Sequence, residues 1–177
     1  MREFKILKYP EWPELNEKLR PLILSLSESQ EDFRLKQKSK LGEAAWLDKH
    51  QYFSIETSWH SQDDLYSHAA FQPLCDFIMS ITENEMEFTS MWAKVAKTGN
   101  SGIKHRHRGR LSGIYYINVG HSANDRKSGK VNFYHNLTKH TIEPNNGDII
   151  IFPSWMFHDV DEYSGSEPRI NISWNMM

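Results

Sequence analysis

Two histidines separated by one residue, His105 and His107, could bind a metal ion together. On a β-strand, residues i and i+2 point to the same face, so both imidazoles would project from one side. A third histidine, His158, ends the segment 147–158, which has the pattern of a turn, a buried strand, a corner containing proline and a new strand. Three such ligands occupy one face of an octahedral ion and leave positions open for substrate and dioxygen.

The C-terminal segment 169–175 supports this interpretation, because a His-x-His pair alone is more often a surface or core feature. Its polar residues share one strand face and its apolar residues the other: Arg169, Asn171, Ser173 and Asn175 against Ile170, Ile172 and Trp174. A half-exposed strand with a solvated face would give the same pattern. Alternatively, Arg169 could point into a barrel beside the metal, where its guanidinium would bind a carboxylate through two hydrogen bonds.

Adjacent tyrosines, Tyr115 and Tyr116, lie on a neighbouring predicted strand and point to alternate faces, so only one of them can reach that interior. The remaining candidates, His121, His135 and His140, lack a comparable context and are expected to be structural or at the surface.

The elements that position these residues change character along the chain. Residues 1–85 are mainly helical, with a helix that begins near Pro13 and is broken or short because of Pro21. A short strand is expected at 51–57, a helix start at Ser61, and a helix at 73–82. Residues 86–177 are predicted to form eight short strands: 87–95, 103–107, 112–119, 130–134, 139–142, 148–152, 156–160 and 169–174.

Short strands that follow a helical block favour an α+β fold that is mainly β, a closed or sandwiched sheet domain with the helices on one side. The 177 residues fit a single domain, and the apolar content of 38% is enough for a core. The net charge of −2 gives no reason to expect nucleic acid or a membrane as a partner, apart from the basic stretch 104–110. Cys75 is alone and is expected to be buried; a cytoplasmic, soluble protein is predicted.

Three segments together resemble a known family: 102–116, 152–158 and 169–175. They are similar to 2-oxoglutarate–iron(II) oxygenases of bacteria and phages, which are distant relatives of prolyl hydroxylases. The resemblance covers about residues 86–177, with a weaker similarity at 58–65. It implies a double-stranded β-helix, a jelly-roll and cupin-like barrel, that hydroxylates a substrate with dioxygen and releases succinate and carbon dioxide.

The resemblance also implies roles for individual residues. Fe(II) would be held by His105, His107 and His158, and Arg169 would bind the distal carboxylate of 2-oxoglutarate. The tyrosine expected to assist is Tyr116 in preference to Tyr115, with Asn171 and Ser173 on the same strand face as Arg169. In the wider superfamily the position of His107 is usually Asp or Glu, so Asp159 and Asp161 are alternative ligands. Segment 132–137 departs from the Phe-x-Asp-Pro of relatives, which concerns the substrate rim.

Two other functions remain open. A metal-binding cupin that does not use 2-oxoglutarate would need a glutamate a few residues after the histidine pair, and none lies near Ser112. A non-catalytic binding module would use the basic stretch 104–110 to contact phosphates. Trp92, Trp155 and Trp174 are expected to be core residues. The substrate, peptidyl or small, is not specified by the sequence, nor is the oligomeric state, for which a homodimer is one option.

Overall fold

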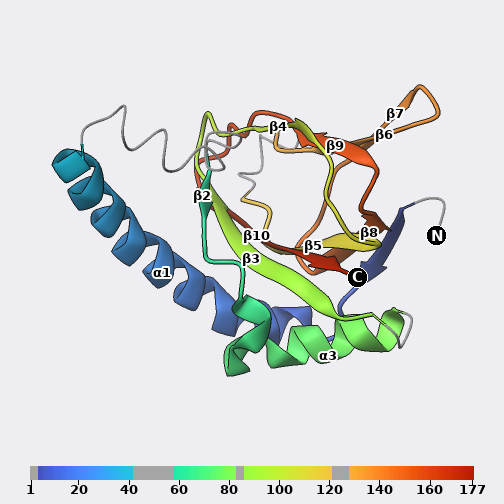
Figure 1. Ribbon diagram of the computed structural model, residues 1–177, viewed down its shortest axis with the longest axis horizontal. Coiled ribbons are helices and arrows are strands. Elements are labelled where there is room, and N and C mark those ends of the chain that lie inside the picture. Colours follow the sequence, from blue (N-terminus) through green and yellow to red (C-terminus); the bar gives the residue numbers. More distant parts are fainter. Residues whose placement is uncertain (1–3, 42–57, 83–85, 121–127) are drawn as a thin grey trace.

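The computed structural model describes residues 4–41, 58–82, 86–120 and 128–177. Two α-helices, α1 (Trp12–Leu41) and α3 (Gln72–Ile81), lie on the same side of a β-barrel (Figure 1). Short 3-10 turns at Leu65–Ser67 and Ala69–Phe71 precede α3. No helix in the described ranges is both long enough and apolar enough to cross a membrane.

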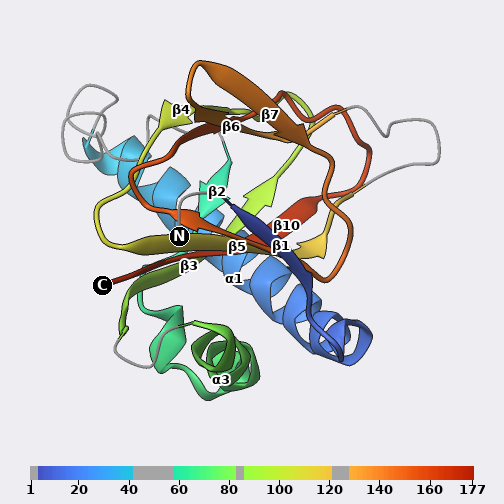
Figure 2. The ribbon, with the colours of Figure 1, turned by 90° about the vertical axis from the view of Figure 1, so that its right-hand side faces the viewer.

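Two antiparallel sheets face one another across the barrel (Figure 2). The larger has the order β1-β8-β5-β10-β3-β2 and consists of β1 (Lys5–Lys8), β8 (Asp148–Pro153), β5 (Leu111–Asn118), β10 (Arg169–Met176), β3 (Phe88–Ala96) and β2 (Trp59–His60). The smaller has the order β4-β9-β6-β7 and consists of β4 (Gly102–His105), β9 (Phe157–Val160), β6 (Val131–His135) and β7 (Thr138–Ile142). From β3 to β10 the chain alternates between the two sheets, apart from the hairpin β6–β7 within the smaller one, which gives a double-stranded β-helix.

The predicted barrel is therefore confirmed, and each of its eight strands lies within two residues of its predicted bounds. Strand β8 shows why an uninterrupted apolar run predicts a strand of this barrel. Ile149 and Ile151 face the helices, whereas Ile150 and Phe152 face the barrel interior. A strand that is covered on both sides is apolar throughout.

Helix α1 differs from the prediction, because it continues through Pro21 to Leu41. Its residues Leu15, Leu19 and Ile23 are buried against the outer face of the larger sheet. Each such side chain contributes roughly 1.5–3 kcal/mol when it is removed from water. This packing offsets the destabilisation by proline, which lacks the N–H for a helix hydrogen bond and clashes with the preceding turn.

The segment before the barrel also contributes strands. Strand β1 was not predicted, although it pairs with β8, and β2 pairs with β3. The predicted strand at 51–57 lies outside the described residues. The helix expected after Ser61 is instead an extended stretch followed by the first 3-10 turn, whereas the helix predicted at 73–82 is confirmed as α3. Cys75 is buried as expected, and burial raises the pKa of its thiol to about 11.

Candidate active site

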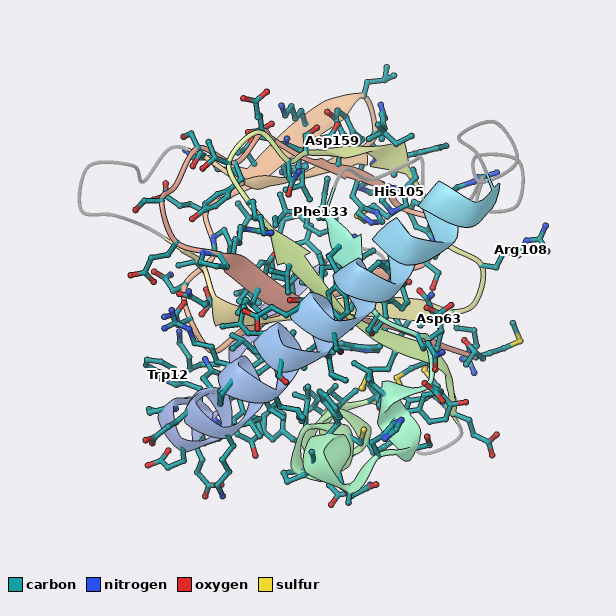
Figure 3. All side chains as sticks on the ribbon, turned by 90° about the vertical axis from the view of Figure 1, so that its left-hand side faces the viewer. Trp12, Asp63, His105, Arg108, Phe133 and Asp159 are labelled. Carbon is teal, nitrogen blue, oxygen red and sulfur yellow. The ribbon has the colours of Figure 1, made fainter. Side chains whose placement is uncertain are left out.

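Three histidines meet in a cleft between the two sheets. Each of the three, His105, His107 and His158, offers one ring nitrogen, and these nitrogens all lie within 4.8 Å of one another. Strand β4 ends at His105, His107 follows it, and β9 presents His158 directly opposite His105 in the antiparallel register. Figure 3 shows His105 pointing from the smaller sheet into the interior. The structure thus brings together the three residues that the sequence pattern selected.

Hydrogen bonds orient two of these rings. Nδ1 of His105 lies 2.7 Å from the carbonyl of Ile103, and Nδ1 of His158 lies 3.1 Å from that of Met156. A carbonyl only accepts, so Nδ1 carries the proton in both rings and Nε2 is the basic nitrogen. Main-chain carbonyls commonly orient metal-ligating histidines in this way. The donor set therefore fits a metal ion.

The third histidine, His107, is held through its backbone. Its N–H donates a 2.9 Å hydrogen bond to the carbonyl of Ser154. Burial, followed by the neighbouring histidines, lowers the pKa of the His107 imidazole to about 3. The ring is consequently neutral over the ordinary pH range, which is the form that binds a metal.

The two aspartates considered as alternative ligands are engaged elsewhere. Asp159 accepts hydrogen bonds from Asn132 (2.7 Å) and from the Tyr134 hydroxyl (2.6 Å). Asp161 accepts one from Asn132 at 2.7 Å. Figure 3 places Asp159 on the outer side of the smaller sheet. Neither aspartate is among the residues that line the cleft in the described part of the chain.

The opposite wall of the cleft comes from β10, whose polar residues Arg169, Asn171 and Ser173 all line it. Arg169 is only 4% exposed, and its Nη1 lies 3.4 Å from the side-chain oxygen of Asn171. Its Nη2 is buried and has no hydrogen-bond partner among the described residues. A buried cationic donor that lacks an acceptor suits an anionic ligand.

The paired tyrosines separate as their alternation requires. Tyr116 lines the cleft, and the guanidinium of Arg169 lies 5.1 Å from its ring centre. Burial raises the pKa of the Tyr116 phenol, and the charge of Arg169 opposes this. Tyr115 points into the helix-side core and donates a 2.6 Å hydrogen bond to Asn16. Of the two candidates only Tyr116 reaches the cleft, and Tyr115 lies on the other face of β5.

The cleft also contains residues that the sequence analysis did not place there, two of them on β3. Trp92 and Lys94 of β3 line the cleft, whereas Ala93 and Val95 pack on the helix side. The expectation that Trp92 is a core residue was thus incomplete, since its ring also lies 5.8 Å from that of His107. Trp174 is buried as expected, whereas Trp155 is 48% exposed, so the expectation that it is a core residue was wrong. The alternation along β3 was the signal that could have identified both residues.

Exposed and half-buried residues alternate along the basic stretch 104–110. Lys104, Arg106 and Arg108 are exposed, whereas His105 and His107 are half-buried. The Lys104 ammonium lies 3.6 Å from the ring centre of Tyr134, and Arg108 projects away from the barrel (Figure 3). The stretch is thus a solvated strand and loop with histidines on its inner face.

A double-stranded β-helix that presents three imidazoles to a buried arginine across one cleft is the arrangement expected of a metal-dependent oxygenase on this barrel. Residues 90–175 match the family described as "Putative 2OG-Fe(II) oxygenase". The match runs from β3 to β10, so the barrel strands that carry the three histidines and Arg169 are similar to this family of 2-oxoglutarate–iron(II) oxygenases. No curated protein sequence matches the chain significantly.

Solved structures share the fold at low sequence identity. A prolyl 4-hydroxylase of Pseudomonas putida is 16% identical over 97% of this chain and 91% of its own, with a TM-score of 0.63. A Trichoplax adhaerens prolyl hydroxylase, bound to a fragment of hypoxia inducible factor, is 14% identical over 99% and 84%, with a TM-score of 0.66. HygX of Streptomyces hygroscopicus, with iron bound, is 8% identical over 98% and 81%, with a TM-score of 0.65.

Proposed function

We propose that this protein hydroxylates its substrate with Fe(II) held by His105, His107 and His158 and with 2-oxoglutarate anchored by Arg169. One observation carries the assignment of residues: three imidazoles, two of them with Nδ1 against a main-chain carbonyl, lie across a cleft from a buried guanidinium whose Nη2 has no partner among the described residues. Bound iron would couple the oxidative decarboxylation of 2-oxoglutarate to the hydroxylation, with succinate and carbon dioxide released.

The protein itself supplies orientation. The guanidinium of Arg169 fixes the far carboxylate of 2-oxoglutarate, and the buried hydroxyl of Tyr116 can donate to the same carboxylate. Asn171 and Ser173 add polar groups along the strand; the side-chain nitrogen of Asn171 donates to the Ser173 hydroxyl at 3.2 Å. These fixed donors reduce the freedom of the bound molecule, which is the contribution that a cofactor enzyme requires of its protein.

Proteins of the same fold have been crystallised with peptides and with small molecules. The Trichoplax enzyme was crystallised with a peptide fragment, and HygX with nickel, 2-oxoglutarate and hygromycin B. We infer a soluble peptidyl or small-molecule substrate for this chain.

The test is anaerobic addition of Fe(II) and then 2-oxoglutarate to the purified protein, with absorbance followed for a metal-to-ligand charge-transfer band. His158→Ala should lose both iron and the band, and Arg169→Ala should keep iron but lose the band. His68→Ala, an exposed histidine, is the matched control and should behave as the wild type. Iron binding without a band in the wild type would favour the cupin function, and absence of iron binding would exclude the proposal.

A further inference from the structure

The side-chain stem of Arg169 packs directly against the backbone of Gly129, which lies just before β6. The φ angle of Gly129 is +65°, and a Cβ at this position would lie 3.1 Å from both Cδ and Nε of Arg169. At such a distance the neighbouring atoms must move by a few tenths of an ångström. Only glycine at position 129 therefore leaves the arginine stem where it is.

The ring of Tyr163 is the second part of this wall. It is buried, it lines the cleft, and its Cδ2 lies 3.2 Å from the same Cβ position at Gly129. Its hydroxyl contacts the carbonyl oxygens of Gly120 and Glu167, and its backbone N–H donates to the carbonyl of Asn100 at 2.8 Å. A close-packed ring that is held at its hydroxyl and at its backbone does not move aside to make room.

Both wall residues lie at the end of the cleft that is remote from the histidines. In the smaller sheet His158 pairs with Phe133. The same register continues to Gly129, whose N–H donates to the carbonyl of Glu162 at 3.2 Å. Gly129 is therefore separated from the level of His158 along the barrel, and Tyr163 follows Glu162 at the same end.

The larger sheet gives Arg169 the same direction. Strand β10 runs from Arg169 to Ser173, which pairs with Trp92, and the Trp92 ring lies 5.8 Å from that of His107. Ser173 is thus at the level of the histidines. Nη1 of Arg169 lies 3.4 Å from the side-chain oxygen of Asn171, between these two levels. The guanidinium consequently reaches from the end wall back toward the histidines.

We propose that Gly129 and Tyr163 set the distance between the Arg169 guanidinium and the metal ligands, and so select the chain length of the 2-oxo diacid. This inference rests on the proposed function, which places 2-oxoglutarate between Arg169 and the three histidines. A methyl group at position 129 would move the arginine stem toward the histidines, because Tyr163 is held in place. The shorter span would disfavour the five-carbon acid and favour a four-carbon one. Both are positioning residues, since they act through Arg169.

The experiment uses the full chain, anaerobic and loaded with Fe(II). Three 2-oxo diacids that differ in length are titrated: oxaloacetate with four carbons, 2-oxoglutarate with five and 2-oxoadipate with six. The charge-transfer band and calorimetry each give a Kd. The wild type should bind 2-oxoglutarate more tightly than either of the other acids, by about tenfold or more, because Arg169 can neither advance nor retreat.

Gly129→Ala should bind 2-oxoglutarate about tenfold more weakly, the scale expected when one charge-assisted hydrogen bond is displaced. Its preference for 2-oxoglutarate over oxaloacetate should fall by at least the same factor, about tenfold. A loss of structure alone would weaken the binding of all three acids together. The change in preference is therefore the result that identifies a positioning role.

Two further variants make the result specific. Gly99→Ala is the matched control, because Gly99 also has a left-handed φ of +87°, but a Cβ there would meet no atom of the described residues within 4 Å. It should lose stability in urea unfolding and keep the length preference. In the double variant Gly129→Ala, Tyr163→Phe, the ring loses its hydroxyl contacts and can yield to the methyl group. Part of the preference for 2-oxoglutarate should then return.

Equal binding of the three acids by the wild type would overturn the inference. An unchanged length preference in Gly129→Ala, with its fold retained by circular dichroism, would overturn it as well. If Gly129→Ala does not fold, the wild-type series decides, since without an end wall 2-oxoadipate should bind as tightly as 2-oxoglutarate. Failure of the proposed function is seen separately, as the absence of a charge-transfer band with every acid although iron is bound.

Discussion

Tyr115 and Tyr116 are adjacent in the sequence, but their hydroxyls lie on opposite sides of β5. The Tyr115 hydroxyl donates to Asn16 at 2.6 Å in the core beneath α1, whereas the Tyr116 hydroxyl is buried beside Arg169 without a partner in the described structure. One tyrosine therefore joins the barrel to the helix, and the other belongs to the cleft.

This difference predicts opposite effects of the same substitution. Tyr115→Phe should lower the free energy of unfolding by about 1–3 kcal/mol, because it leaves the buried Asn16 oxygen without its donor. Tyr116→Phe should leave stability nearly unchanged and weaken 2-oxoglutarate binding several-fold. Urea unfolding and titration of the charge-transfer band measure the two quantities. Equal losses of 2-oxoglutarate affinity in both variants would contradict the assignment.

Position 113 requires glycine because Trp174 lies opposite it in the β5–β10 register. A Cβ at position 113 would overlap the indole of Trp174. We expect Gly113→Ala to destabilise the protein by about 1–3 kcal/mol, as overpacking of a core does. The double variant Gly113→Ala, Trp174→Phe should recover part of this loss, and strictly additive effects in urea unfolding would refute the contact as the cause.

The barrel could be predicted because it depends on alternation within short strands, and Arg169 and Asn171 share a face for this reason. His107 lies just beyond the end of β4, but the alternation of exposed and half-buried residues continues to it from His105. The role of Trp92 was harder to predict, because its indole is buried and also lines the cleft. The residue type alone does not distinguish a core tryptophan from one in a site. Tertiary packing decided the rest: β1 forms because β8 offers it a free edge, which no local pattern indicates.

Pro21 shows how packing overrides local preference, since α1 runs through it while Leu19 and Ile23 stay buried. Pro21→Ala would restore an N–H to the helix and remove the clash with the preceding turn. We expect the free energy of unfolding to rise by about 1–3 kcal/mol in thermal or urea unfolding. Pro13→Ala is the control, because the first turn of a helix does not need that N–H, and it should change stability little. A gain no larger than that of the control would show that α1 already accommodates Pro21 without cost.

The low pKa of His107 predicts how the metal-free protein responds to acid. Unfolded His107 takes up a proton near pH 6.5, whereas the buried ring remains neutral down to a pH of about 3. The unfolded state thus binds more protons between these values, so stability should fall as the pH is lowered from about 6.5 toward about 3. Urea unfolding with a chelator present measures this, and His107→Gln should flatten the dependence. An unchanged slope in that variant would assign the acid sensitivity to other groups.

Ser154 is expected to position His107. Its carbonyl accepts the His107 N–H at 2.9 Å, and its hydroxyl bonds that of Ser112 at 2.9 Å, which in turn donates to Asn175 at 2.7 Å. Ser154→Ala keeps the carbonyl but removes the hydroxyl that ties this corner to Ser112, and it should cost about 1 kcal/mol of stability.

Because the ring of His107 depends on its backbone, the same variant should also weaken Co(II) binding, by about tenfold on the scale of other groups that support metal ligands. Calorimetric titration of Co(II) measures it. The matched control is Ser27→Ala, which removes a buried hydroxyl that donates to Leu24 within α1 at 2.8 Å. The control should lose similar stability but no metal affinity, since it is remote from the histidines. If both variants bind Co(II) equally well, Ser154 stabilises the barrel without positioning His107.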